Sequence, residues 1–462
     1  MTEWSDKHVL VLGLGETGLS LVRWLSAQGA LVRAADSRDL PPSLDTLRSQ
    51  FPQAELRCGV FRSELLDGIE LIAVSPGVSL HDPLLVKAAE RHIAIAGDIE
   101  LFAQSLPVER CPKIIAITGT NGKTTVTSMV GAMCRAAGLD TAVAGNISPA
   151  VLDALLERQG RQPDVWVLEL SSFQLEATFS LNADAATVLN VSEDHLDRYS
   201  DMGDYIAAKA RIFRSSGQVK GVQVLNRDDP YSAGMGLMGR MQTTFGLSAP
   251  LPAGDDWGVE HDSEGIWLVN GNRRVLNAGE LKVTGLHNIA NALAALALCR
   301  SVGLPLKPLL EGLRAFNGLP HRVEEAAEIN NVVYYDDSKG TNVGATIAAL
   351  RGLGRYAVLI AGGDGKGQDF SPLAEAVAEH ARAVVLIGRD AGKIAEALEN
   401  SGVSLVFASD MGDAVRQSAS LAQPGDAVLL SPACASFDMF RNYAHRAEVF
   451  IAAVHALQGE AP

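Results

Sequence analysis

The segment at residues 116–130, AITGTNGKTTVTSMV, most restricts the folds that are open to this chain. An apolar run of strand type ends in the glycine-rich turn GTNGKTT, and a helical pattern follows. In such a turn backbone N–H groups converge on phosphate oxygens, and the helix N-terminus adds its partial positive charge. The usual pattern GxxxxGK[ST] would place glycine where the chain has Ile117, so the loop is a shortened variant, GxxGK[ST]. A glycine turn with an exposed lysine is the alternative, and the flanking strand and helix argue against it.

Bulk properties exclude several classes of protein. The 462 residues carry a formal net charge of −15 and show no basic run, so we expect no nucleic-acid partner. No long apolar stretch or signal-type N-terminus is present, so we predict a cytoplasmic protein without membrane insertion. Five scattered cysteines indicate reduced thiols rather than a disulfide or zinc framework. Among them Cys434, in SPACAS, is interpreted as a buried small hydrophobe rather than a nucleophile.

Strand-type and helical segments alternate along most of the chain. Strand candidates include residues 8–13, 30–36 and 69–77 in a first block, and 165–170, 186–191 and 221–226 in a second. A third block alternates again through VVYYDDS, YAVLIAGG, AVVLIG, VSLVFAS and AVLLSPA. This pattern predicts α/β architecture with parallel sheets. We predict three domains in series: a Rossmann-like domain at 1–109, a central P-loop-type domain at 110–318 and a Rossmann-like domain at 319–462.

A second glycine-rich turn, GLGETG at residues 13–18, matches GxGxxG, and Asp36 ends the next strand candidate. This pattern is the fingerprint of dinucleotide-binding domains, so a nicotinamide-dependent dehydrogenase is an alternative function for the chain. A nucleotide-sugar diphosphate would use the same donors, and the glycines could also serve only helix–strand packing. The motif therefore predicts a phosphorylated ligand without identifying it.

Carboxylates and a histidine follow the strands of the central block. Glu169 lies inside an apolar strand, where a buried carboxylate must pair, protonate or bind a cation. Asp194 and His195 follow the next strand, at the edge where such sheets bind ligands. Glu169, Thr124 and His195 could surround one or two Mg²⁺ ions, although His195 alone could be structural. On the long helix candidate, Asn288 and Asn291 share one face, which suits a nucleobase or ribose, with a helix cap as the alternative for Asn288.

These motifs as a set resemble the Mur ligases, ATP-dependent amide-forming enzymes of peptidoglycan precursor synthesis, and the related folylpolyglutamate synthases. The resemblance rests on GTNGKTT, ELSSFQL, EDHLDRY, GLHNIANALAA, HR and DDSKGTN, and it spans nearly the whole chain. The segments GGDGKG at 362–367 and LSPACASFDMFRNYAHRAEVF at 430–450 are similar to those of the member that adds D-glutamate to UDP-N-acetylmuramoyl-L-alanine. The resemblance thus implies ATP, UDP-N-acetylmuramoyl-L-alanine and D-glutamate as substrates, two Mg²⁺ ions as cofactors, and a monomeric enzyme.

The resemblance also assigns roles to individual residues. Catalysis would fall to Lys123, Glu169, His195, Lys209 and Arg322, with Lys209 carried as a carbamate. Metal would be held by Thr124, Glu169, His195 and the carbamate of Lys209. The ATP site would comprise Gly119, Thr120, Asn121, Gly122, Lys123, Thr124, Thr125, Asn288, Asn291, His321, Arg322 and Asp337. The UDP-substrate site would comprise Thr17, Asp36, Ser37, Arg38, Gly77 and Asn146, and the D-glutamate site Lys339, Thr341, Lys366, Ser436, Phe437 and Tyr443.

Three positions depart from the family pattern. Asp336 and Gly340 stand where asparagine and alanine are expected, and Tyr443 stands where phenylalanine is common. The chemistry expected is transfer of the ATP γ-phosphoryl group to a carboxylate, followed by attack of an amine on the acyl phosphate. A superfamily member acting on a folate or a later precursor, the dehydrogenase named above and a non-catalytic nucleotide-binding regulator are the alternatives.

Overall fold

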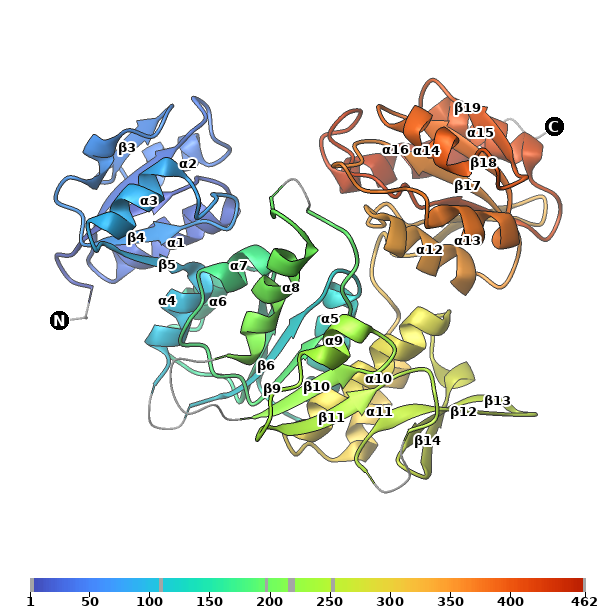
Figure 1. Ribbon diagram of the computed structural model, residues 1–462, viewed down its shortest axis with the longest axis horizontal. Helices are drawn as coiled ribbons and strands as arrows, with labels where there is room; N and C mark the ends of the chain where they lie inside the picture. The colour runs from blue at the N-terminus through green and yellow to red at the C-terminus, as the bar shows by residue number, and fades with distance from the viewer. Residues whose placement is uncertain (1–3, 108–110, 196–197, 215–220, 251–253, 460–462) are drawn as a thin grey trace.

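The computed structural model describes residues 4–107, 111–195, 198–214, 221–250 and 254–459. These residues form three lobes in chain order, each built on its own sheet (Figure 1). The first predicted domain boundary, between residues 109 and 110, lies outside the described residues. The second, between residues 318 and 319, falls in the loop between the helix that ends at Ala315 and the strand that begins at Glu324, and it stays a prediction.

The N-terminal sheet is parallel, and its described strands run in the order β3-β2-β1-β4-β5. The apolar runs at residues 8–13, 30–36 and 69–77 contain β1, β2 and β4, and α1 begins within GLGETG, at Glu16. The bounds are β1 (His8–Leu12), α1 (Glu16–Ala27), β2 (Leu31–Asp36), α2 (Leu44–Gln50), β3 (Glu55–Cys58), η1 (Ser63–Leu66), β4 (Leu71–Val74), α3 (Pro83–Glu90), β5 (Ala94–Gly97) and α4 (Asp98–Ser105).

The central sheet runs in the order β14-β13-β12-β11-β10-β9-β6-β8-β7 among the described residues. Its first part comprises β6 (Lys113–Thr118), α5 (Lys123–Ala136), β7 (Thr141–Gly145), α6 (Val151–Glu157), β8 (Val165–Glu169), α7 (Ser172–Glu176), β9 (Ala185–Val188), α8 (Met202–Ala210), η2 (Arg211–Phe213) and β10 (Val222–Asn226). The rest comprises α9 (Pro230–Gly234), β11 (Met241–Phe245), β12 (Trp257–Asp262), β13 (Gly265–Asn270), β14 (Arg273–Asn277), η3 (Ala278–Glu280), α10 (Leu286–Ser301) and α11 (Leu306–Ala315).

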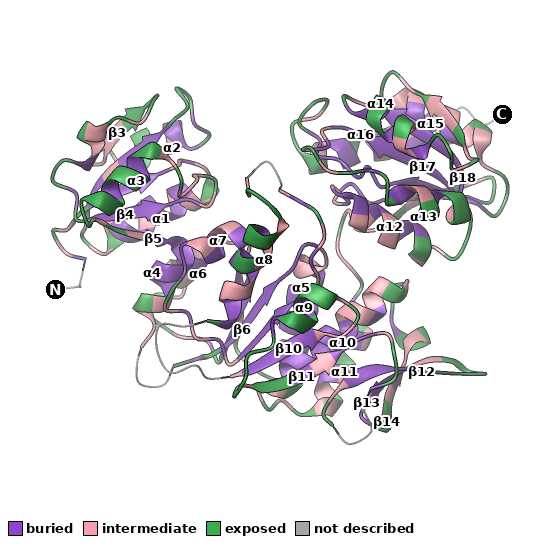
Figure 2. Cartoon of the chain, in the orientation of Figure 1, coloured by how far each residue is buried: buried purple, intermediate pink, exposed green. Residues whose placement is uncertain are grey.

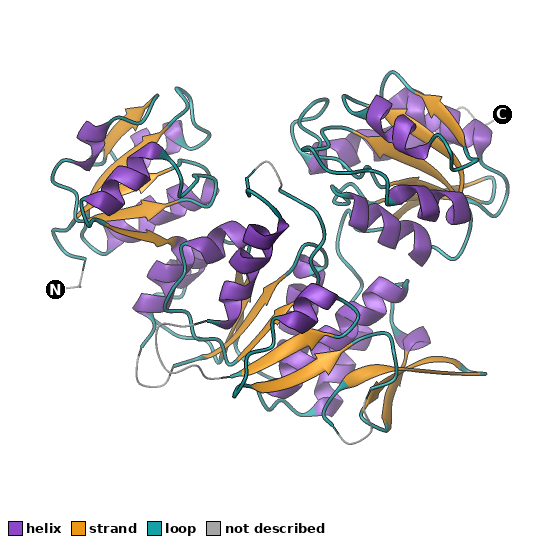
Figure 3. Cartoon of the chain, in the orientation of Figure 1, coloured by secondary structure: helices purple, strands orange, loops and turns teal. Residues whose placement is uncertain are grey.

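One part of the central lobe differs from simple parallel order. The region after residue 226, which has no clear periodicity in sequence, forms β11 and then the antiparallel strands β12, β13 and β14. These strands extend the sheet at the lower right of Figure 1. Helices α5, α10 and α11 pack together over the sheet (Figure 3). Since α10 is apolar nearly all round, it lies buried between the sheet and its neighbouring helices (Figure 2).

The C-terminal sheet has the order β15-β16-β20-β17-β18-β19 in the described chain, with β15 antiparallel to β16 and the other pairs parallel. The five apolar runs predicted as strands of this block form β16 to β20. The bounds are β15 (Glu324–Ile329), β16 (Val332–Asp336), α12 (Val343–Gly352), β17 (Ala357–Gly362), α13 (Leu373–His380), β18 (Ala381–Ile387), α14 (Ala391–Leu398), β19 (Ser404–Phe407), α15 (Met411–Leu421), β20 (Ala427–Leu430) and α16 (Tyr443–Gly459). The predicted three-part α/β fold is therefore confirmed.

Three smaller expectations can be compared with the structure. The cysteines are free thiols, and Cys434 is fully buried, with burial raising the pKa of its thiol to about 12. Such a thiol is an inert core residue, as expected. Across the described part of the chain, none of the helices combines the length and the apolar character that a membrane crossing requires.

Candidate active site

The turn between β6 and α5 has the form of a phosphate-binding loop. Gly119 and Gly122 have φ values of 150° and 82°, which side chains with a Cβ rarely adopt. A Cβ added at Gly122 would also lie 2.6 Å from Oδ1 of Asn291. The turn is held by hydrogen bonds from Thr120 N to the Asn190 carbonyl at 2.9 Å and from Asn121 N to Asn190 Oδ1 at 2.8 Å. The start of α5 is thus fixed with its N–H groups available to an anion.

Lys123 folds back over this turn. Its Nζ donates to the carbonyls of Gly119 and Thr120, each at 2.9 Å. Burial lowers the pKa of the Lys123 ammonium, although Glu169 and Asp194 act in the opposite direction. The Lys123 ammonium is therefore partly shielded from water and already lies at the turn, where it can attract a bound phosphate.

Glu169, at the end of β8, faces the same space from the neighbouring strand. Its side chain is 2% exposed, and Oε1 accepts a hydrogen bond of 2.8 Å from Nδ2 of Asn146. The other oxygen, Oε2, is buried and has no hydrogen-bond partner among the described residues. An unsatisfied buried carboxylate oxygen suits a hard cation, so this donor set fits Mg²⁺. Asn146, expected at the UDP-substrate site, therefore also orients the Glu169 carboxylate.

His195 and Asp194 approach from the loop after β9. His195 has a φ of 58°, and its Nε2 lies 3.6 Å from Asp194 Oδ2. Burial lowers the pKa of the His195 imidazole, which favours the neutral ring that metal ions bind. Two residues of the EDHLDRY motif, 196 and 197, lie outside the described residues.

Lys209, on α8, is 1% exposed. Its Nζ donates to the Gly119 carbonyl at 2.9 Å and lies 4.4 Å from the centroid of the Tyr205 ring. Burial, helped by the charge of Lys123, lowers the pKa of the Lys209 ammonium far below its usual range. Lys209 is therefore a buried side chain beneath the phosphate loop and not a solvated helix lysine.

A cavity of about 340 Å³ opens beside the loop, between the central and C-terminal lobes. The predicted nucleotide residues Asn121, Gly122, Thr125, Asn288, Asn291, Arg322 and Asp337 all line it. The Asn288 amide donates to the Thr284 carbonyl at 2.8 Å and accepts from Asn291 at 3.3 Å, so the two amides orient each other. Burial raises the pKa of the Asp337 carboxyl to about 7, against a hydrogen bond from Ser431 Oγ at 2.6 Å. The lining of the cavity mixes apolar side chains with amide and charged groups, which can contact both the base and the polar parts of a nucleotide.

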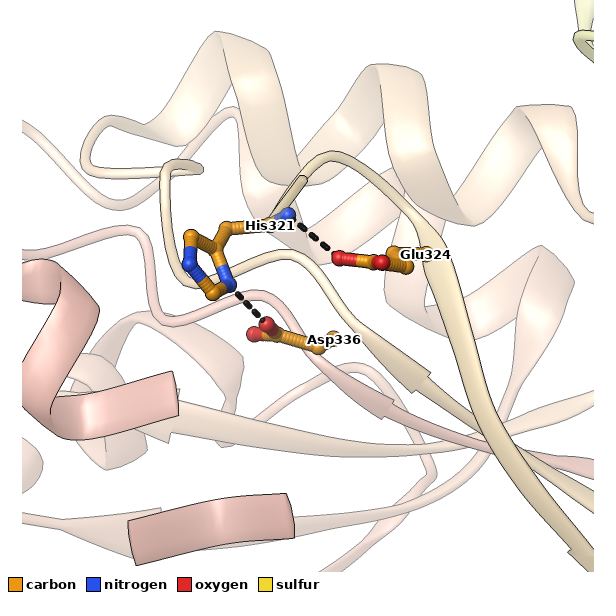
Figure 4. A group of neighbouring side chains, drawn as sticks. All are labelled: His321, Glu324 and Asp336. Carbon is orange, nitrogen blue, oxygen red and sulfur yellow. Dashed lines mark hydrogen bonds and ion pairs between the residues drawn. The ribbon is translucent and has the colours of Figure 1, made fainter. Parts of the chain in front are cut away.

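His321 is held by two carboxylates (Figure 4). Its Nδ1 lies 2.6 Å from Asp336 Oδ2, and its backbone N–H donates to Glu324 Oε2 at 2.8 Å. Ligand atoms of these three residues lie within 4.8 Å of one another. Asp336 also accepts from Ser338 N and Oγ, so the buried carboxylate is satisfied without an ion. Asp336, which departs from the family pattern, thus fixes the orientation of the His321 ring.

A second cavity of about 610 Å³ adjoins the first, and residues of all three lobes line it. It brings together the predicted residues Thr120, Asn121, Gly122, Lys123, Thr124, Asn146, Glu169, His195, His321, Arg322, Lys339, Thr341, Lys366 and Tyr443. Lys339 lies 3.8 Å above the Tyr443 ring, and burial lowers the pKa of its ammonium to about 8. Ser436 and Phe437, expected with them, do not line the cavity: Ser436 is buried and Phe437 is exposed.

Contacts between lobes close this second cavity. Arg322 Nη2 donates to Thr124 Oγ1 at 3.1 Å, and Lys366 Nζ pairs with Asp194 at 2.9 Å. The side chains of Asn121 and Asn342 exchange hydrogen bonds of 3.2 and 3.0 Å. Asn342 was missed by the sequence interpretation, although it lies within the quoted motif DDSKGTN.

The N-terminal lobe holds the remaining predicted residues away from the cavity. The Asp36 carboxylate accepts from Leu14 N at 2.7 Å and from both the backbone and the guanidinium of Arg38. Burial acts to raise the pKa of Asp36, but these hydrogen bonds outweigh it and lower the pKa to about 2. A Cβ at Gly18 would lie 1.8 Å from the Gly13 carbonyl, so packing alone requires this glycine of GLGETG. Thr17, Ser37 and Gly77 belong to the same lobe, in α1 and in the loops after β2 and β4.

Family models match three successive parts of the chain: the Mur ligase MurD-like N-terminal domain at residues 7–97, the Mur ligase middle domain at 117–299 and the Mur ligase glutamate ligase domain at 321–434. The chain belongs to the Mur ligase family. The matched middle domain begins at the strand that carries the phosphate loop, and the matched glutamate ligase domain begins at His321. The two cavities of this Mur ligase therefore lie where the matched domains meet.

Close relatives carry one name. The UDP-N-acetylmuramoylalanine–D-glutamate ligase of Nitrosospira multiformis is 58% identical over 456 residues, covering 98% of this chain and 96% of that protein. The ligase of the same name from Methylobacillus flagellatus is 57% identical over 458 residues, covering 99% of each chain.

Solved structures share the fold. The UDP-N-acetylmuramate-alanine ligase MurC of Thermotoga maritima has a TM-score of 0.61 at 20% identity, covering 98% of this chain and 100% of that chain. FolC of E. coli has a TM-score of 0.56 at 20% identity, covering 77% of this chain and 92% of that chain.

Proposed function

We propose that this Mur ligase joins D-glutamate to UDP-N-acetylmuramoyl-L-alanine, with cleavage of ATP to ADP and phosphate. The observation that carries the proposal is the second cavity, in which a phosphate loop, a buried carboxylate with an unsatisfied oxygen and cations of the C-terminal lobe meet. The close relatives that bear this ligase name support the choice of substrates. The match of residues 7–97 to a Mur ligase domain disfavours the dehydrogenase alternative.

The reaction needs activation because an amine does not displace hydroxide from a carboxylate at neutral pH. The carboxylate of the muramoyl-alanine substrate attacks the γ-phosphorus of ATP, the bond to the β-phosphate oxygen breaks, and ADP leaves. The D-glutamate amine then attacks the acyl phosphate, phosphate leaves, and the amine loses a proton. Positioning and charge stabilisation dominate such transfers, and the protein forms no covalent bond.

The residues take roles that their places allow. Lys123 and the N–H groups at the start of α5 neutralise the β- and γ-phosphates, and Arg322 reaches the transferring group from the C-terminal lobe. Asn288, Asn291 and Asp337 surround the nucleoside. Lys339, Thr341, Lys366 and Tyr443 receive the D-glutamate carboxylates. Asp36 and its neighbours, at the end of β2 in the N-terminal lobe, receive the uridine diphosphate.

Divalent cations complete the site. Glu169, Thr124 and His195 would hold two Mg²⁺ ions, which screen the repulsion between the substrate carboxylate and the phosphates. Lys209 would join them as a carbamate, formed when its neutral amine adds to CO₂ with loss of a proton. The lowered pKa of Lys209 favours this step, because only the unprotonated amine is a nucleophile.

The test is release of ADP by the purified chain with each substrate omitted in turn. Replacing UDP-N-acetylmuramoyl-L-alanine with a folate or with a later precursor separates other superfamily activities. Turnover with a folate acceptor, or none with the muramoyl-alanine acceptor, would contradict the proposal.

A further inference from the structure

We infer that Arg198 is a positioning residue that ties the nucleotide-sugar turn of the N-terminal lobe to the His195 side of the cavity. The inference rests on the proposed function, since it concerns the binding of the UDP substrate. Arg198 follows the loop after β9 in the central lobe, and its side chain is 16% exposed. It took no part in the site expected from the sequence.

The Arg198 guanidinium forms a hydrogen bond to the N-terminal lobe. Its Nη2 donates a hydrogen bond of 3.1 Å to the carbonyl of Val78. Val78 closes the turn after β4, in which its N–H donates to the Ser75 carbonyl at 3.0 Å. This turn includes Gly77, which we place at the UDP-substrate site.

The turn at residues 75–78 packs against the glycine-rich loop GLGETG. A Cβ added at Gly13 would lie 2.8 Å from Cγ2 of Val78 and 3.0 Å from Cβ of Ser75. The Ser75 N–H also donates to the Leu12 carbonyl at 2.9 Å, at the end of β1. Because Val78 and Ser75 pack against Gly13, the hydrogen bond to Val78 also fixes the surface beside the start of the predicted diphosphate-binding loop.

Arg198 also contacts the central lobe, in part through the same nitrogen. Its Nη2 lies 3.3 Å from Glu176 Oε2, and its Cζ lies 4.6 Å from the centroid of the Phe173 ring. The Phe173 ring in turn meets the His195 ring edge-on, with centroids 4.8 Å apart. The Arg198 backbone N–H donates to the His195 carbonyl at 2.9 Å. One guanidinium thus fixes both the substrate turn and the aromatic side chain that supports His195.

Arginine suits this position for a physical reason. Its planar guanidinium offers five donors and can stack on an aromatic ring while it bonds two acceptors, whereas lysine offers a single point of charge. Without the guanidinium, the turn at residues 75–78 would lose its tie to the central lobe and sample other positions. Because only the held arrangement binds well, the affinity for the nucleotide sugar should fall by about tenfold, in proportion to the competent fraction.

The chain offers a matched control in Arg211. This arginine also contacts helix α7 and its end, donating to the Leu175 carbonyl at 2.8 Å and stacking 5.0 Å from the Phe179 centroid. Its described hydrogen bonds go to Leu175 and Thr178, which belong to the central lobe. Arg211→Gln therefore removes a comparable arginine without touching the turn at residues 75–78.

The experiment is calorimetric titration of the full chain with UDP-N-acetylmuramoyl-L-alanine, in the absence of ATP and Mg²⁺. Arg198→Gln should weaken binding about tenfold, Arg198→Lys should recover part of the loss, and Arg211→Gln should bind as the wild type does. A parallel titration with a non-hydrolysable ATP analogue and Mg²⁺ should give the same affinity in all four proteins. In turnover, the KM for the nucleotide sugar should rise more than kcat falls.

The outcomes separate the two proposals. A wild-type chain that does not bind the nucleotide sugar would contradict the proposed function. If the wild type binds and Arg198→Gln binds equally well, the positioning role is overturned and the proposed function stands. Equal losses of affinity for the nucleotide sugar and the ATP analogue would also overturn it, since they would show general damage to the central lobe.

Discussion

Arg322 of the C-terminal lobe donates a hydrogen bond of 3.1 Å to the hydroxyl of Thr124, the second residue of helix α5 in the central lobe. The contact brings a partly buried guanidinium onto the phosphate loop, although the two residues lie 198 positions apart in sequence. Burial lowers the pKa of Arg322, against the opposing charges of Asp337 and Glu169, so the cation is held in a desolvated site. A charge placed in this way is suited to stabilise a transferring phosphoryl group.

Arg322→Lys should therefore lower kcat on the order of 10²-fold, because one ammonium cannot bond Thr124 and also reach a phosphate. The measurement is ADP release at saturating substrates. Arg314→Lys is the control, since Arg314 forms an exposed pair with Glu280 at 2.7 Å. Similar rates for both variants would remove Arg322 from the chemistry.

Lys123→Ala should lower kcat on the order of 10²–10³-fold, as expected for loss of one donor to the transition-state charge. Its Nζ already points to the two loop carbonyls, so the charge is preorganised at the phosphates. Lys113→Ala, at the exposed start of β6, should turn over normally. A Lys123→Ala enzyme with wild-type kcat would contradict the account of the loop.

Lys209→Ala should be nearly inactive and should regain part of its activity with a short-chain carboxylate, which can replace the carbamate oxygens. Carbon-13 NMR with labelled bicarbonate should show one carbamate signal in the wild type that the variant lacks. Lys282→Ala, which changes an exposed lysine bonded to Asn317, should keep the signal. Full activity of Lys209→Ala without added carboxylate would refute the carbamate.

Asp98 gives a prediction about stability. It is fully buried, Gln174 donates to its Oδ2 at 2.9 Å, and its Oδ1 has no partner among the described residues. Burial raises the pKa of this carboxyl from 3.8 to about 6, so the folded chain binds a proton more tightly than the unfolded chain does. The wild type therefore loses stability as pH rises from about 4 to about 7, by roughly 3 kcal/mol at most.

Asp98→Asn lacks this titration. Its free energy of unfolding relative to the wild type should therefore increase between about pH 5 and about pH 8, by roughly 1 kcal/mol. Urea unfolding followed by circular dichroism checks this, with Asp67→Asn on the exposed surface as the control. A difference that does not change with pH would show that Asp98 keeps an ordinary pKa.

The motifs whose residues interact within one short segment were predictable from the sequence. The strand, glycines and Lys123 of the phosphate loop act within one short segment, and alternating apolar runs were enough to place most parallel strands. Glu169 was predicted as a site residue because burying a carboxylate in an apolar strand is costly unless it has a partner. In the structure its oxygen Oε2 is buried without a hydrogen-bond partner among the described residues.

Contacts between lobes were not predictable from one sequence. The pairing of Lys366 with Asp194, the exchange between Asn121 and Asn342, and the grip of Arg198 on Val78 depend on how the lobes meet. The hydrophobic periodicity of the sequence carries no information about how the lobes are arranged. The antiparallel strands β12 to β14 were missed for a related reason, since short, partly exposed strands have a weak apolar pattern.

The most direct test of the account is coupled measurement of ADP release by the purified chain with UDP-N-acetylmuramoyl-L-alanine, ATP and Mg²⁺, comparing D-glutamate with L-glutamate. The account predicts ADP release that requires both the muramoyl-alanine substrate and D-glutamate, with no activity toward L-glutamate. ADP release that is indifferent to the amino acid, or equal with the two enantiomers, would contradict it.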